Sequence, residues 1–157
     1  MSPCPNARLL SSCFPHHPIH IPHAITAHSI LRSCDGAARR RYYEALRAGN
    51  HAYAVTGFRN FVERFPGHDF ADNAQYWLGE AFYDQKDYKS ALVEFRKVVD
   101  NHPQGNKVPD ALLKVGYCYS QLAEVDKAKQ VWQQVLQVYP KSNPAALAAT
   151  KLSELEN

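Results

Sequence analysis

Residues 76–103 read YWLGEAFYDQKDYKSALVEFRKVVDNHP, and residues 113–140 read LKVGYCYSQLAEVDKAKQVWQQVLQVYP. The two stretches align at a spacing of 37 residues, so that a glycine, an alanine, an aromatic residue and a proline fall at matching places. A period of this length is typical of one supersecondary unit that is copied and stacked, because a single unit cannot bury its apolar face alone. The sequence therefore predicts a repeat protein.

The same alignment continues one period earlier, where Ala54, Phe58 and Pro66 occupy the matching positions. Apolar residues within each unit recur at the three- and four-residue spacing of an amphipathic helix. The small residues of the pattern have a packing role, because they let two helices approach closely. We expect Gly79 and Gly116 to serve such a contact, since glycine otherwise lowers helix stability.

These patterns predict an all-α fold of three helix-turn-helix repeats followed by one capping helix. The repeats are expected at about 37–66, 70–103 and 107–140. The expected helices are 37–48 and 51–64, 70–85 and 88–101, 107–122 and 125–138, and finally 144–155. Prolines end each second helix, where they cannot continue the backbone hydrogen bonds.

Capping residues mark where these helices begin. Asn50 and Asp87 precede second helices, and their side chains can accept the free N–H groups of the first turn. Asp69, Asn106 and Asn143 are expected to do the same for the helices that open the following units.

Residues 1–36 differ in composition from the rest of the chain and are predicted to be a disordered leader. They are rich in proline and histidine and show no helical or strand period. One alternative is a metal-binding protein, with His16, His17, His20, His23 and Cys13 as ligands to zinc or copper. Another is a mis-assigned translation start. A flexible leader is favoured, because a structural zinc site needs a folded frame and none is indicated.

Bulk properties argue against several classes of function. The net charge of +3 is mild, and no basic stripe interleaved with aromatic residues indicates nucleic-acid binding. No apolar stretch approaches the ~20 residues of a membrane span, and the N-terminus lacks the order of a secretory signal. Phosphate loops, HExxH and nucleophile elbows are missing, so we expect no enzyme activity and no cofactor. Cys118 is expected to be a small core residue.

The pattern resembles the tetratricopeptide repeat. The resemblance is carried by Leu78-Gly79, Phe82, Ala91, Phe95 and Pro103, and by their counterparts 37 residues later. The usual period of this repeat is 34, so three extra residues are expected in each loop that follows the proline. The resemblance implies a right-handed superhelix whose concave face is lined by the first helix of each unit.

Residues on that face that are not needed for packing are the candidate protein-binding site. They include several tyrosines, which combine apolar area with a polar tip and are enriched at interfaces. The candidates are Arg39, Tyr43, Leu46 and Arg47 from the first unit, Asn73, Tyr76, Glu80, Tyr83 and Asp84 from the second, and Asp110, Leu113, Tyr117, Ser120 and Gln121 from the third.

A narrower resemblance is to the C-terminal domain of the Tol-Pal system protein YbgF, also called cell division coordinator CpoB. It is carried by Phe65-Pro66, the run 76–80, His102-Pro103 and Asp126-Lys127-Ala128. It implies a periplasmic protein that binds TolA and links outer-membrane constriction to septal peptidoglycan synthesis through a peptidoglycan synthase. That family trimerises through an N-terminal coiled coil, and residues 1–36 show no heptads. A monomer or weak homo-oligomer is therefore expected.

The pattern also bears on two other kinds of repeat protein. A chaperone adaptor would clamp a C-terminal carboxylate, but the aligned positions lack the paired lysine and asparagine of that clamp. An outer-membrane assembly lipoprotein, or another envelope adaptor, is the alternative. It would need a lipobox cysteine behind a signal sequence, and Cys4 and Cys13 lack that setting.

Overall fold

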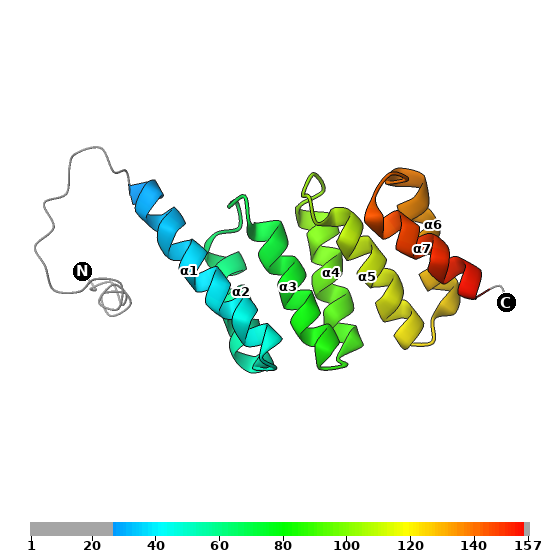
Figure 1. Cartoon of the computed structure of the whole chain (residues 1–157), viewed down its shortest axis with the longest axis horizontal. Helices are drawn as coiled ribbons and strands as arrows, with labels where there is room; N and C mark the ends of the chain where they lie inside the picture. Colours follow the sequence, from blue (N-terminus) through cyan, green and yellow to red (C-terminus); the bar gives the residue numbers. More distant parts are fainter. Residues whose placement is uncertain (1–26, 156–157) are drawn as a thin grey trace, which may run out of the picture. The chain divides into compact units, whose positions relative to one another are not determined.

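The computed structural model describes residues 27–155. In this range it contains seven helices and no strand, which confirms the expected all-α fold (Figure 1). The helices are α1 (Ala27–Arg47), α2 (His51–Arg64), α3 (Ala71–Asp84), α4 (Tyr88–Asn101), α5 (Val108–Gln121), α6 (Val125–Val138) and α7 (Asn143–Glu154). The chain divides into two compact units, residues 1–40 and 41–157, which are described separately.

In the N-terminal unit, helix α1 begins at Ala27 and not at residue 37. The expectation that the whole of 1–36 is disordered is therefore wrong for its last part. The reason lies in the position of the prolines, because Pro22 is the last one before residue 66. From Ala27 onward nothing interrupts helix formation except Gly36, whose cost in a helix is only about 1 kcal/mol. The proposed histidine and cysteine metal ligands, at residues 13–23, lie outside the described residues.

In the C-terminal unit, each helix from α2 to α7 packs on the next one in the chain, as the succession of ribbons in Figure 1 shows. First helices also contact one another across the repeats, α3 with α5 and α5 with α7. The buried residues form three clusters in succession along the chain. Their largest fully buried side chains are the repeated aromatics Phe58, Phe95 and Trp132, each at most 1% exposed.

The two glycines predicted to allow close packing do so. A Cβ atom on Gly79 would fall 2.7 Å from Cδ1 of Phe95, and one on Gly116 would fall 2.7 Å from Cε2 of Trp132. The indole Nε1 of Trp132 also donates a hydrogen bond to the Leu113 carbonyl oxygen over 3.2 Å. Helices α3 and α5 therefore carry a glycine because the aromatic ring of the following second helix occupies the space of its side chain, whereas in the first repeat Tyr42 holds this position and Gly57 of α2 faces its ring.

The turn within each repeat has the same backbone conformation three times. Gly49, Lys86 and Ala123 stand one period apart and have φ values of 79°, 61° and 61°. In the second turn the Asp87 N–H donates to the Phe82 carbonyl over 3.0 Å, which closes a Schellman motif. The sequence analysis missed this series, because lysine and alanine do not signal a left-handed residue.

The predicted caps of the second helices are confirmed. Oδ1 of Asn50 accepts from the Tyr53 N–H over 3.3 Å, and Oδ1 of Asp87 accepts from the Ser90 N–H over 3.2 Å. Glu124, at the third such position, makes no side-chain cap bond.

The predicted caps of the first helices, Asp69, Asn106 and Asn143, are wrong. The residues at the N-cap positions are Phe70, Lys107 and Ser142. Only Ser142 caps with its side chain, whose Oγ accepts from the Ala145 N–H over 3.2 Å. In the longer loops a backbone carbonyl takes this role, as when the His68 oxygen accepts from the Ala71 N–H over 2.8 Å.

Candidate functional site

The candidate site is the surface formed in the C-terminal unit by the first helices α3, α5 and α7 and the end of α1, here called the first-helix face. Its predicted members differ in exposure. Tyr43, Arg47, Asp84 and Gln121 are exposed; Asn73, Glu80, Tyr83, Asp110, Tyr117 and Ser120 are half-buried; Leu46, Tyr76 and Leu113 are buried. Arg39 is exposed and belongs to the N-terminal unit.

Three of the predicted contact residues are part of the core. Leu46, Tyr76 and Leu113 are 6%, 8% and 5% exposed. The ring centroid of Tyr76 lies 5.4 Å from that of Phe95 and 5.4 Å from that of Trp77. The prediction that these positions are not needed for packing is therefore wrong, because their side chains fill the space between consecutive repeats.

A salt bridge between two repeats lies at the centre of this face. The Lys114 ammonium on α5 is 2.8 Å from both Glu80 carboxylate oxygens on α3, and the two side chains are only 22% and 15% exposed. Hydrogen-bond geometry is met at Oε2 only, which leaves Oε1 buried without such a bond. Burial raises the pKa of Glu80, and the Lys114 charge opposes that rise. The same ammonium lies 4.8 Å from the ring centroid of Tyr83.

A second lysine of the face is also held by its neighbours. Lys107 Nζ lies 5.2 Å from the ring centroid of Tyr76 and 3.5 Å from Oδ2 of Asp110. Burial, and secondarily the charge of Glu80, raise the pKa of the Tyr76 phenol. Lys107 and Lys114 therefore each contact a carboxylate and an aromatic ring of the chain itself.

The tyrosines that reach the surface stand against other rings. Tyr43 is 36% exposed and packs edge-on against Trp77, with centroids 4.7 Å apart. Tyr117 packs in the same way on Trp132, at 5.7 Å. A side chain that is fixed on one side and accessible on the other loses little conformational entropy when a partner binds.

Sequence reasoning missed the contribution of the last helix to this face. Leu147 on α7 is 51% exposed, and it stands one period after Asp110. Lys151 stands one period after Lys114 and pairs with Glu154 over 2.6 Å. The 37-residue alignment could have identified both positions if it had been extended into the capping helix.

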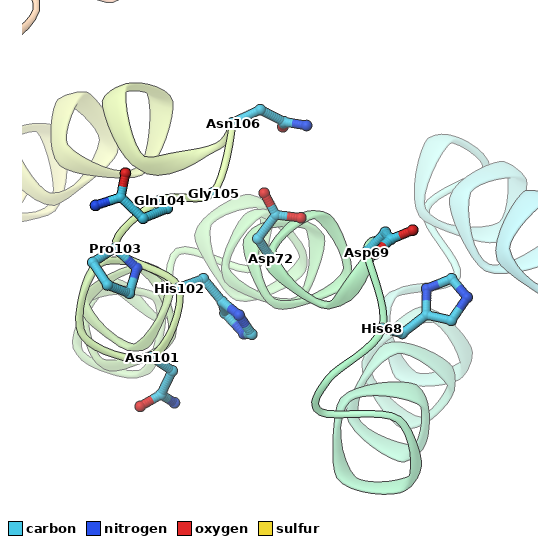
Figure 2. Close-up of a pocket in the computed structure, with 9 residues that line it drawn as sticks. All are labelled: His68, Asp69, Asp72, Asn101, His102, Pro103, Gln104, Gly105 and Asn106. Carbon is cyan, nitrogen blue, oxygen red and sulfur yellow. The ribbon is translucent and has the colours of Figure 1, made fainter.

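The two lengthened loops line an open, polar depression of about 530 Å³. Figure 2 shows Asp72 beneath the second loop, with His102 and His68 on either side. Asp72 is 5% exposed and is held by the chain itself, since its Oδ1 accepts from the Asn73 N–H over 2.6 Å and its Oδ2 from the Lys107 N–H over 3.4 Å. A Cβ on Gly105 would lie 2.7 Å from that Oδ2. The carboxylate thus ties the first turn of α3 to the end of the second loop.

The described part of the chain shows neither a metal cluster nor a membrane span. Among the side chains that the structure describes, no three histidine, cysteine or acidic groups gather in a way that could hold a metal ion. No helix between residues 27 and 155 is both long and apolar enough to cross a membrane.

Comparison with known families gives a match over residues 37–157 to the model of YfiO, an outer membrane lipoprotein family. The chain belongs to this family. The sequence analysis placed such a lipoprotein second because of the missing lipobox, but the YfiO match rests on the repeat domain and does not involve the N-terminal cysteines. The narrower resemblance to YbgF stays a prediction. A search of curated proteins found no match.

Solved structures with the same architecture include the second tetratricopeptide-repeat domain of human RPAP3 in complex with an HSP70 peptide, SGPTIEEVD, at 15% identity and a TM-score of 0.62. That alignment covers 74% of this chain and 92% of the other. The Arabidopsis OM64 domain aligns at 15% identity and a TM-score of 0.63, covering 76% of this chain and 94% of that one. Because the identity is only 15%, these likenesses show a shared fold and nothing more. The shared tetratricopeptide-repeat fold confirms the fold that the sequence predicted.

Proposed function

We propose that this YfiO-family chain is a non-catalytic interaction domain of the cell envelope, which binds a protein partner through the first-helix face during outer-membrane assembly. The family match supports the envelope and the outer membrane as the place of action. Stacked helical repeats of this kind present extended binding surfaces and not enclosed catalytic pockets. A periplasmic location follows from the same reasoning and is part of the proposal.

The observation that carries the proposal is a column of exposed polar residues, one from each repeat. Arg47, Asp84 and Gln121 stand one period apart, each in the last turn of its first helix, and all three are exposed. Within the described residues none of them makes a side-chain hydrogen bond or an ion pair. These side chains occupy the same position in successive repeats but are basic, acidic and neutral. Such a column can contact successive residues of a partner segment, each through a different chemistry.

The charges of the face also suggest which partners it disfavours. Two of the similar solved domains hold acidic peptides, SGPTIEEVD and SRMEEVD. In this chain Lys114 is already paired with Glu80, and Lys107 with Asp110. An acidic peptide would have to displace the half-buried Glu80 or Asp110 carboxylate from its lysine, which leaves that carboxylate without its counter-charge. The proposed partner is therefore neutral or mixed in charge where it meets these helices.

The test compares capture of envelope proteins by the full chain and by two matched triple variants. One variant changes the proposed face by Arg47→Gln, Asp84→Lys and Gln121→Lys. The control makes the same three kinds of change at exposed positions of second helices, by Lys89→Gln, Glu63→Lys and Gln133→Lys.

We expect the face variant to lose an outer-membrane assembly protein that the wild type and the control both retain, with the helical circular-dichroism signal unchanged in all three. Equal capture of that protein by the face variant and the control variant would contradict the assignment of partner binding to the first-helix face. The YbgF-like residues support a second candidate function, which is binding of TolA and a peptidoglycan synthase in cell division. Recovery of those proteins instead of assembly proteins would favour this second function.

A further inference from the structure

A second candidate binding site lies behind the first-helix face. A cavity of about 230 Å³ opens between α4, α5 and α6. Its floor includes Leu112 and Val115 of α5, which are 7% and 4% exposed. At 100° per residue, these side chains point to the side of α5 opposite Tyr117 and Gln121. The cavity is therefore separate from the first-helix face.

The equivalent position one repeat earlier is closed by side chains of the protein itself. There Gln75 replaces Leu112, and Glu94 replaces Val131 of the cavity wall. Nε2 of Gln75 donates to Oε2 of Glu94 over 2.5 Å, and both residues are buried. Lys97 covers the pair, with its Nζ 3.0 Å from each carboxylate oxygen.

The two repeat interfaces thus differ in the side chains that meet at this position. The polar bridge that spans α3 and α4 has been replaced by leucine and valine between α5 and α6, and these side chains cannot form it. An enclosed apolar cavity of about 150 Å³ is large enough to bind benzene. The space here is larger and half open, and Arg96, Asp100 and Gln134 line it beside the apolar side chains; Gln134 stands one period after Lys97. The space found here can accept one branched or aromatic side chain.

Charged groups at the rim indicate what should flank that side chain. Arg96 and Asp100 lie one helical turn apart on α4 and line the opening. Within the described residues neither forms an ion pair or a side-chain hydrogen bond, although their spacing would allow them to pair with each other. The apolar floor therefore lies between one positive and one negative group, both open to a partner.

We propose that this groove binds a segment of a partner protein that presents one apolar side chain between an acidic and a basic residue. The apolar side chain fills the cavity, the acidic residue meets Arg96 and the basic residue meets Asp100. The proposal goes beyond the proposed function, because it places a second contact on the other side of the repeats. Failure of either proposal leaves the other intact, since the two surfaces share no residue.

The test uses alanine-rich helical peptides with phenylalanine at the centre and charged residues one turn to either side. The flanking residues are glutamate and lysine, two glutamates or two lysines, and a fourth peptide replaces the phenylalanine of the mixed pair by alanine. Titration of the full chain by calorimetry should show the mixed peptide binding at least tenfold more tightly than the other three. Methyl shifts in the NMR spectrum should be confined to the four methyl-bearing residues that line the cavity, Val99, Leu112, Val115 and Val131.

Two variants of the full chain sharpen the test. Leu112→Gln with Val131→Glu and Gln134→Lys copies the polar bridge of the preceding repeat and should abolish the preference for phenylalanine. Arg96→Glu leaves the core untouched and should shift the preference to the peptide with two lysines; it decides the question if the triple variant fails to fold. The proposal would be overturned if the affinity did not depend on the phenylalanine, or if Arg96→Glu did not change which flanking charges bind best. So would a dimer of the chain that Arg96→Glu abolishes, because a second copy would then occupy the groove.

Discussion

Replacement of Gly116 by alanine tests the packing on which the repeats depend. In an open helix this change would stabilise the chain by about 1 kcal/mol, because alanine has the higher helix propensity. Here the new Cβ would overlap the indole ring of Trp132, which is 1% exposed. The ring must move, and its hydrogen bond to the Leu113 carbonyl must lengthen or break.

The net effect can be estimated from these contributions. Overpacking a core costs about 1–3 kcal/mol, and a buried N–H left without its acceptor costs about 1–3 kcal/mol more. After the gain in propensity, we expect a loss of about 3 kcal/mol in the free energy of unfolding and a decrease of about 10 °C in Tm. Urea titration followed by circular dichroism and by tryptophan fluorescence measures both the loss and the exposure of the indole.

Gly67→Ala is the matched control, because a Cβ at that loop position meets nothing within 4 Å. It should change stability by less than about 0.5 kcal/mol. If Gly116→Ala proves as stable as the wild type, the close contact between the first helix and Trp132 is refuted. The glycine column would then need another explanation.

Three further predictions concern the turns and the charged centre of the face. Ala123→Gly should raise the free energy of unfolding by about 0.5–1 kcal/mol in urea titration, because alanine is strained at a φ of 61°; an unchanged value would argue against the left-handed turn. Burial raises the pKa of Tyr83 from 10.0 to about 12, which means that the folded state favours the neutral form of the phenol. The wild type should therefore lose stability relative to Tyr83→Phe as the pH rises from 10 to 12, and parallel pH profiles would contradict this. A double-mutant cycle of Glu80→Gln and Lys114→Met should give a coupling energy of about 1–2 kcal/mol, whereas additive effects would mean that the pair does not join the repeats.

The helix pattern could be predicted from sequence because each signal was repeated. The second helices begin and end as expected, since Asp87 is both the end of one turn and the cap of the next helix. Helices α3 and α5 are one residue shorter at each end than expected, and α7 lies one residue earlier. At the starts of α3 and α5, backbone carbonyls in the longer loops replace the expected side-chain caps. The start of α1 differs from the expected one because the composition of residues 1–36 as a whole predicts disorder, although the prolines of this segment end at Pro22.

The candidate site was less predictable, because periodicity gives the face of a helix and not the depth of a side chain. Tyr76 and Leu113 lie on the expected side of their helices and are nevertheless buried by the neighbouring repeat. The pairing of Lys114 with Glu80 depends on how two repeats stack, which no local pattern specifies. The open groove beside Val131 depends on which side chains meet between α5 and α6, and the repeat period does not specify these contacts.

The most direct test of the central claim is photo-crosslinking of the full chain in envelope extract. A crosslinking amino acid is placed in turn at Arg47, Asp84 and Gln121, and at Glu63 and Lys89 on the second helices as controls. We predict that the first three positions give adducts with one and the same outer-membrane assembly protein and that the two controls do not. Adducts with that protein from the controls alone would contradict the assignment of partner binding to the first-helix face.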